Sequence, residues 1–237
     1  MAVEFNNSGV KYIKWTNPVG AIGNTAKTIH VRFYYATAGL SQTLFLLFDG
    51  TGTDTDEYFY FSTGSVSNLK VQFGAHFSTT DGVWVTTNNV LTAGAINDII
   101  VTYDGSSTSN NPSIYVNGIS AAITRSIAPV GTYRTGTGAD IYLGDTLSAG
   151  NPNGKILSAN MYSAVLSSQE IAEMSASKVA IPNWRRLVFA PALWNVADNA
   201  TLGATNIIRD LITGVSGVPT GSPTGRADNY LTIEGIN

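Results

Sequence analysis

The chain contains no cysteine, few charged residues and no long apolar run. Without cysteine it has no disulfide framework, no thiolate nucleophile and no cysteine-ligated zinc. Charged residues make up 12% of its 237 positions, against a usual share of ~25%. No apolar stretch in the sequence approaches the roughly 18–20 residues needed to cross a bilayer.

Basic residues are scarce as well. Lysine and arginine number 13 against 16 acidic residues, which gives a net charge of -3. A nucleic-acid binder needs a basic face to displace counterions, so the composition disfavours that class. The first eight residues have no basic region followed by an apolar one, so we expect no secretion signal. Because 43% of the residues are hydrophobic, a folded core is expected rather than a disordered chain.

Apolar and polar residues alternate along most of the chain, which is the pattern of half-buried strands. In residues 28–35 the apolar positions share one face, and residues 69–77 repeat the pattern. Residues 43–48 form a continuous apolar run, as expected of a strand covered on both faces. Further strands are predicted at residues 57–62, 83–87, 99–103 and 113–116. Many short strands separated by Gly-, Asp- and Asn-rich turns predict an antiparallel two-sheet sandwich or barrel.

Two local signals are more specific. Asn117 and Gly118 both tolerate positive φ and separate two short apolar runs, which predicts a tight type I′ hairpin. Ser167 and Glu170 form a capping box, and Ile171 and Met174 follow at the spacing of an apolar helical stripe. The sequence therefore predicts one short helix of about two turns after residue 167.

Three segments occur in the order that is typical of one family. They are residues 99–105 (IIVTYDG), 114–118 (IYVNG) and 154–171 (GKILSANMYSAVLSSQEI). Together they resemble the laminin-G-like, concanavalin A-like jelly-roll family, including its members in phage virion proteins. The resemblance covers roughly residues 1–176 and implies an all-β, antiparallel two-sheet jelly-roll sandwich with a concave face. Ile96, Ala159 and Met161 depart from the residues usual in that family, and we interpret these departures as changes in packing.

The C-terminal part of the chain differs from the rest. Residues 187–194 and 208–214 resemble a segment of laminin-G-like proteins from phages and bacteria, where it often opens a jelly roll. Only about 60 residues follow the predicted helix, too few for a second sandwich of roughly 100 residues. We therefore predict a sandwich domain at 1–177 and a C-terminal arm at 178–237 that packs on the sandwich or on a neighbouring subunit. Residues 214–226, rich in Gly and Pro, are predicted to form an extended loop.

Acidic residues were considered for catalysis and for calcium, because the resembled family contains glycoside hydrolases and calcium sites. Hydrolysis needs two carboxylates about 5–10 Å apart, and Asp54, Asp56 and Glu57 come closest to such a set. They fall in a Gly/Thr-rich turn, so a solvated hairpin tip is the favoured interpretation. Asp49, Asp54 and Asp56 offer oxygen ligands for calcium, but turn formation by their side chains is the favoured interpretation.

The two histidines give little sign of chemistry. His30 and His76 fall on the polar sides of predicted strands, with no serine or acid motif of a triad. We expect both to be surface or rim residues. The sequence therefore predicts no catalytic residue, no cofactor and no metal ligand, and we expect that the protein is not an enzyme.

Aromatic residues on strand faces offer one binding hypothesis. Tyr58, Tyr60, Trp84 and Tyr115 are placed where they could line a concave sheet and stack on sugars. The alternatives are core packing and an intersubunit patch. Arg185 and Arg186 beside Trp184 are interpreted as a solvated pair next to a buried ring.

Three classes of function follow. The first is a non-enzymatic virion structural protein, a phage capsid decoration or accessory head or tail protein. Its expected partners are the major capsid or other virion proteins and copies of itself. The second is a lectin-like carbohydrate-binding adhesion module with a glycan as its partner. The third, a glycan-degrading enzyme, is disfavoured by the missing carboxylate pair. The first is the favoured prediction, and it places the protein in a virion, without nucleic acid or membrane as a partner.

Overall fold

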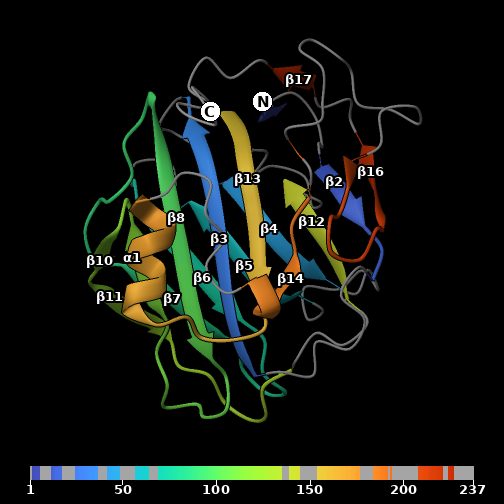
Figure 1. Cartoon of the computed structure of the whole chain (residues 1–237). Helices are drawn as coiled ribbons and strands as arrows, with labels where there is room; N and C mark the ends of the chain where they lie inside the picture. Colours follow the sequence, from blue (N-terminus) through green and yellow to red (C-terminus); the bar gives the residue numbers. More distant parts are fainter. Residues whose placement is uncertain are drawn as a thin grey trace.

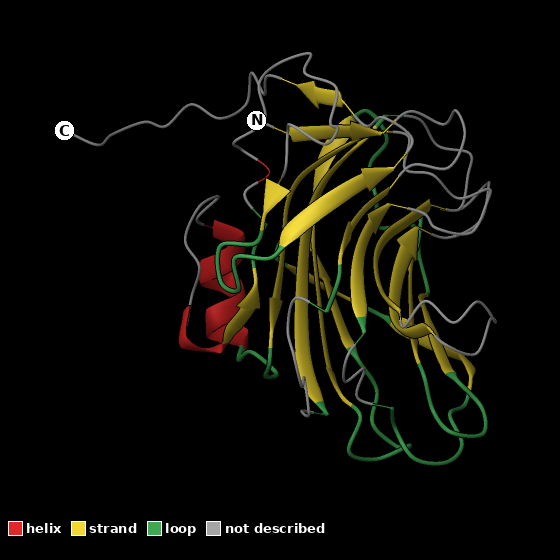
Figure 2. Ribbon diagram, turned by 90° about the vertical axis from the view of Figure 1, so that its right-hand side faces the viewer, coloured by secondary structure: helices red, strands yellow, loops and turns green. Residues whose placement is uncertain are grey.

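The computed structural model describes the residue ranges 2–5, 12–17, 25–36, 42–48, 57–63, 69–134, 139–144, 154–176, 184–191, 193, 208–220 and 224–226. Two antiparallel sheets stack face to face, and one helix lies against the outer side of one of them (Figure 1 and Figure 2). The predicted all-β, two-sheet jelly-roll class with one short helix is confirmed.

We call the sheet that carries the helix sheet A and the other sheet B. Sheet A has the strand order β10-β9-β8-β3-β13-β1-β17, with β14 pairing β13. Its strands are β10 (Ile119–Ala121), β9 (Ser113–Val116), β8 (Ala95–Asp104), β3 (Ala26–Tyr35), β13 (Gly154–Tyr162), β1 (Ala2–Phe5), β17 (Thr224–Arg226) and β14 (Leu187–Phe189).

Sheet B has the order β11-β7-β6-β5-β4-β12-β2-β16-β15. Its strands are β11 (Ile123–Ile127), β7 (Gly82–Thr86), β6 (Val71–Ala75), β5 (Glu57–Thr63), β4 (Gln42–Phe48), β12 (Asp140–Gly144), β2 (Tyr12–Trp15), β16 (Ser216–Thr220) and β15 (Ile208–Arg209). Both sheets pair strands that are distant in sequence, so the sandwich depends on long-range contacts.

The main core lies between the two sheets and follows the predicted alternation. On β3, Ile29, Val31 and Phe33 are buried against residues of sheet B, and on β6 Val71 and Phe73 face them. Burying each such side chain contributes about 1.5–3 kcal/mol. Ala159 and Met161, two of the departures from the resembled family, are also buried in this core.

Helix α1 (Ser168–Ala176) begins as the capping box predicts. The Ser167 amide donates to the Glu170 carboxylate at 2.7 Å, and the Glu170 amide donates to Ser167 Oγ at 3.3 Å. Ile171 and Met174 are the buried residues of the helix. They form a second cluster with Ile100, Tyr162, Leu166, Leu187 and Ala190 on the outer face of sheet A. The helix therefore covers part of that face.

The hairpin between β9 and β10 also forms as predicted. Asn117 has φ 52° and Gly118 has φ 79°, the positive values that a type I′ turn requires. The Asn117 side chain accepts a hydrogen bond from the Asp98 amide at 2.9 Å, while its own amide donates to the Asp98 carbonyl at 2.7 Å. The turn is thus tied to the neighbouring strand β8.

Residues 214–226 are not an extended loop throughout, so that prediction is wrong. Two strands form there: β16 pairs β2 in sheet B, and β17 pairs β1 in sheet A. Strand β15 covers only Ser216 and Gly217 of β16, so Pro219 lies where β16 is an edge strand and its missing N–H is tolerated. A Cβ on Gly217 would come within 2.5 Å of the Trp15 ring, so glycine is required for this close packing.

The described strands of the C-terminal segment thus pair with strands of the same chain. The Trp15 indole N–H donates to the Ile208 carbonyl at 3.1 Å. The buried Asp210 carboxylate accepts hydrogen bonds from the amides of Ala190 at 2.7 Å and Thr213 at 2.8 Å. The Trp15 contact attaches the segment to sheet B, the Asp210 contacts hold the segment together, and the pairing of β14 with β13 and of β17 with β1 attaches it to sheet A. The division of the chain at residue 177 stays a prediction.

Candidate functional site

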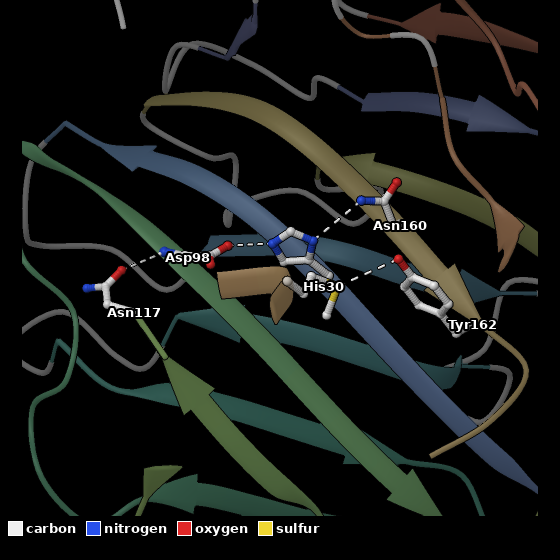
Figure 3. Close-up of polar contacts among 6 residues, drawn as sticks. His30, Asp98, Asn117, Asn160 and Tyr162 are labelled. Carbon is white, nitrogen blue, oxygen red and sulfur yellow. Dashed lines mark hydrogen bonds and ion pairs between the residues drawn. The ribbon is translucent and has the colours of Figure 1, made fainter. Parts of the chain in front are cut away.

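A polar network lies on the outer face of sheet A, beside helix α1 (Figure 3). His30 on β3 contacts the Asp98 carboxylate on β8 through Nε2, and its Nδ1 lies 3.4 Å from the amide nitrogen of Asn160 on β13. If the Asn160 amide donates to Nδ1, the ring donates its Nε2 proton to Asp98. The network therefore joins three neighbouring strands through one imidazole.

His30 is 5% exposed, so the prediction of a surface or rim histidine is wrong for it. The same holds for His76, also 5% exposed, whose Nδ1 lies 2.7 Å from the Asp81 carboxylate. Each histidine is buried beside an aspartate: His76 beside Asp81 of the following turn, and His30 beside Asp98, which is distant in sequence. Among the polar contacts drawn in Figure 3, His30 meets a carboxylate and an amide, and no serine completes a triad.

The predicted aromatic platform does not form as expected. Trp84 is fully buried in the core, where its ring stacks on Phe73 and its indole N–H donates to Asn111 at 2.9 Å. Tyr115 is half-buried against the helix-side cluster on the outer face of sheet A. The side chains of Tyr58 and Tyr60 lie outside the described residues. Trp84 is therefore excluded as a sugar-stacking residue.

The acidic residues considered for catalysis or calcium cannot be placed. Asp49, Asp54 and Asp56 lie outside the described residues, as does the side chain of Glu57. Within the described ranges, no three side chains of His, Asp or Glu come together as metal ligands would. Arg185 and Arg186 are exposed, in a short 3-10 helix, η1 (Trp184–Arg186).

The outer face of sheet B carries a different group of residues, which we call the Tyr12–Lys14 cluster. It comprises Tyr12 and Lys14 on β2, Asp140 and Tyr142 on β12, and Leu46 on β4. Successive side chains of a strand point to opposite faces, so the cluster residues of β2 and β12 face outward. The residues that alternate with them point into the core: Ile13, Trp15, Ile141 and Leu143. Lys14 and Tyr142 are direct cross-strand partners, and so are Tyr142 and Leu46.

The cluster is held together by an ion pair and by ring contacts. Lys14 Nζ lies 2.6 Å from Asp140 Oδ2 and 5.5 Å from the centre of the Tyr142 ring. The rings of Tyr12 and Tyr142 meet edge to face, with their centres 5.3 Å apart. Asp140 Oδ1 accepts a hydrogen bond from the Asn17 amide at 2.9 Å. The strands β2 and β12 thus place an aromatic pair beside a charged pair.

The environment sets the charge state of these groups. The hydrogen bond to Asp140 is the main cause that raises the pKa of Lys14 above its usual value, so Lys14 stays charged. Burial is the main cause that raises the pKa of the Tyr142 phenol, so this residue stays neutral. The cluster therefore presents the Lys14 cation beside the neutral Tyr142 phenol.

Access to the cluster is uneven. Leu46 and Tyr142 are buried, whereas Tyr12 is half-buried and the Lys14 side chain is 32% exposed. Val218 on β16, the cross-strand partner of Lys14, is 61% exposed. The accessible part of this face thus consists of Tyr12, Lys14 and Val218, and Asp140 and Tyr142 contact Lys14 and Tyr12 from the buried side.

Sequence reasoning did not single out this cluster. The segment 12–15 (YIKW) alternates as a strand does, and residues 140–144 (DIYLG) do the same. This periodicity could have predicted both strands and the outward placement of Tyr12 and Lys14. It could not have predicted that Asp140 lies beside Lys14, because that contact depends on which strands pair.

The fold is shared with several solved structures. The CBM40 of the Ruminococcus gnavus IT-sialidase, bound to α2,3-sialyllactose, is 14% identical with a TM-score of 0.53, covering 74% of this chain and 98% of that one. A Bacteroides ovatus protein assigned to carbohydrate binding is 15% identical with a TM-score of 0.62, over 96% of this chain and 60% of that one. The heptameric SAP-like pentraxin of Limulus polyphemus is 10% identical with a TM-score of 0.55, over 73% and 81% of the two chains. At such identities these likenesses establish the fold alone.

The comparison of sequences is more specific. No curated protein sequence matches the chain. Among the described residues, no helix is long and apolar enough to span a membrane. Residues 7–172 match a laminin G family model described as the concanavalin A-like lectin/glucanases superfamily. Since this match covers most of the chain, the protein belongs to the concanavalin A-like lectin/glucanase superfamily.

Proposed function

We propose that the chain is a non-enzymatic carbohydrate-binding module that holds a glycan against the Tyr12–Lys14 cluster. The observation that carries the proposal is the accessible pair of Tyr12 and Lys14 on the sheet face that α1 does not cover. An aromatic ring packs against the apolar C–H face of a sugar, and charged groups bond its hydroxyls. A few polar groups placed beside apolar surface are the usual composition of a ligand site.

The superfamily and the structural neighbours support this proposal. The superfamily description names lectins, and the R. gnavus CBM40 is bound to a sialylated sugar. The B. ovatus protein is also assigned to carbohydrate binding. These relatives make glycan binding a better supported function for this chain than the virion role that its sequence led us to expect.

Binding without hydrolysis is proposed because the described residues of the site offer one carboxylate, where hydrolysis uses two. Glycoside hydrolysis uses two carboxylates, one of them protonated to act as an acid. Asp140 is the sole carboxylate of the Tyr12–Lys14 cluster, and it is ion-paired with Lys14. Among the described residues of the cluster, the second carboxylate that hydrolysis needs is therefore missing.

The experiment that tests the proposal is glycan binding by a matched pair of tyrosine variants. Tyr12→Ala removes the accessible ring of the cluster, and we expect it to weaken glycan binding about tenfold or more, as losses of stacking rings do. Tyr34→Ala is the control, since Tyr34 is half-buried on the outer face of sheet A under Lys155. Isothermal titration against an oligosaccharide panel measures both. Equal binding by both variants, or no saturable binding by the unaltered chain, contradicts the proposal.

A role in virion assembly is the second candidate. The observation that favours it is the exposure of Leu211, Ile212 and Val218, three large apolar side chains on the C-terminal segment. Exposed apolar side chains that gather in one patch are typical of a contact between protein subunits. Fixed-ratio co-purification with intact particles tests this role. A chain that stays monomeric and separates from particles contradicts it.

A further inference from the structure

The charge balance of the Tyr12–Lys14 cluster bears on which glycans it accepts. Lys14 is the cation of the cluster, and its Nζ lies 2.6 Å from Asp140 Oδ2. The pair is partly shielded from water, since the Asp140 side chain is only 10% exposed. A shielded ion pair is screened less by salt than an exposed one, so the two charges remain coupled. The net charge of the cluster is therefore zero.

Asp140 is fixed in this position from two sides. Its Oδ2 faces Lys14, and its Oδ1 accepts the hydrogen bond from the Asn17 amide at 2.9 Å. Its strand β12 is paired on both edges, with β2 and with β4. The carboxylate therefore cannot leave Lys14 without breaking a second hydrogen bond. A ligand that approaches Lys14 also approaches this negative charge.

We propose, on the basis of the proposed function, that the site prefers neutral glycans and discriminates against glycans that carry a carboxylate. A sugar hydroxyl both donates and accepts hydrogen bonds, so it can accept from Lys14 and donate to Asp140. A sugar carboxylate only accepts, and beside Lys14 it would meet the like charge of Asp140. Like charges placed together select against a ligand as effectively as missing contacts do.

The inference separates this chain from one of its structural neighbours. The R. gnavus CBM40 is bound to α2,3-sialyllactose, a sugar with a carboxylate. The two chains share a fold at 14% identity, so the fold does not determine the charge of the preferred sugar. In this chain the ion pair on the outer face of sheet B determines it.

The test compares lactose with 3′-sialyllactose on the unaltered chain and on Asp140→Asn. The unaltered chain is expected to bind lactose about tenfold more tightly than 3′-sialyllactose. Asp140→Asn keeps an oxygen for the Asn17 amide, removes the negative charge and frees Lys14. This variant is expected to gain about tenfold in affinity for 3′-sialyllactose, so that the preference for lactose over 3′-sialyllactose is lost.

A matched control removes a negative charge elsewhere. Asp104→Asn alters a carboxylate that accepts a hydrogen bond from the Ser106 amide at the end of β8, and it should leave both affinities within twofold. Salt provides a readout that needs no variant. Salt screens interactions between charges, and lactose carries no charge. Its affinity should therefore change less than about twofold between 50 and 500 mM NaCl.

The outcomes distinguish the two proposals. If neither sugar nor any other member of an oligosaccharide panel binds, the proposed function fails. If 3′-sialyllactose binds the unaltered chain at least as tightly as lactose, or if Asp140→Asn leaves the ratio unchanged, the charge inference fails while the proposed function stands. If Asp140→Asn does not fold, the ratio measured on the unaltered chain alone still decides the inference.

Discussion

At the scale of single residues, the most unusual side chain is Lys27. It is fully buried on β3, with Nζ 3.0 Å from the hydroxyl of Tyr133. Nζ also lies 4.7 Å from the centre of the Tyr133 ring. Burial lowers the pKa of Lys27 from 10.5 to about 7. Near pH 7 the amine is thus partly deprotonated in the folded protein, although it is charged in the unfolded chain.

This shift predicts how stability depends on pH. Between pH 7 and 10 the unfolded chain binds more protons at Lys27 than the folded chain does, so the free energy of unfolding rises with pH. The slope is at most about 1.4 kcal/mol per pH unit. Urea unfolding between pH 7 and 9.5 should show the rise, and Lys27→Met should flatten it. A rise of the same size in Lys27→Met contradicts the assignment.

The upper limit of that pH range matters because of two neighbouring phenols. Burial raises the pKa values of Tyr103 and Tyr133 above their usual value of about 10. Groups whose pKa is raised on folding lose their stabilising contribution as pH climbs past the unfolded value. Above pH 10 these two tyrosines therefore oppose the effect of Lys27, and measurements below that pH isolate the lysine.

At the scale of elements, short sequence motifs correctly predicted the turn and the helix start that depend on contacts between residues close in sequence. The positive φ of Asn117 and Gly118 and the capping box of Ser167 and Glu170 each involve residues a few positions apart. Their outcome depends little on the rest of the fold. The helix is nine residues long, which is marginal alone. Its cap and its contacts with sheet A both contribute to keeping it in place.

This predicts a measurable cost for losing the cap. Ser167→Ala removes the hydroxyl that accepts the Glu170 amide, and it should lower the free energy of unfolding by about 1 kcal/mol. Ser168→Ala, one position later at the first residue of α1, is the matched control and should have a smaller effect. Chemical denaturation measures both variants. If both variants lose the same stability, the cap does not explain the effect.

Elements that depend on distant pairing were predicted less well. Residues 216–220 contain Gly217 and Pro219, which locally indicate a loop, yet they form a strand because β2 offers an edge. Glycine is required at position 217 because the Trp15 ring leaves no space for a Cβ there, and Trp15 lies about 200 positions earlier in the chain. No short-range pattern carries that information.

At the scale of the whole molecule, alternation predicted the sandwich but not what lies on its outer faces. Residues such as Ile29 and Val31 indicate which face is buried, and the core confirms them. The opposite face looks polar in the sequence, so His30 was expected at the surface. It is buried beside Asp98, 68 positions away, because β3 lies between β8 and β13 and the face is partly covered.

The same limit applies to the candidate site. Tyr12 and Tyr142 are distant in sequence, and the pairing of β2 with β12 brings them together. Charged residues make up only 12% of the chain, and the Tyr12–Lys14 cluster is consistent with this low charge. The Lys14 amine is matched by the Asp140 carboxylate, so even the charged part of this surface is neutral.

The most direct test of the glycan-binding proposal is where a bound sugar lies. Amide chemical shifts of the isotope-labelled chain, followed during titration with lactose or the best neutral ligand of the panel, report the contact surface. The proposal predicts saturable shifts concentrated on β2, β12 and β16, around Tyr12, Lys14 and Val218. Shifts concentrated on the outer face of sheet A around His30 and Tyr34, or no saturable shifts with any glycan, would contradict it.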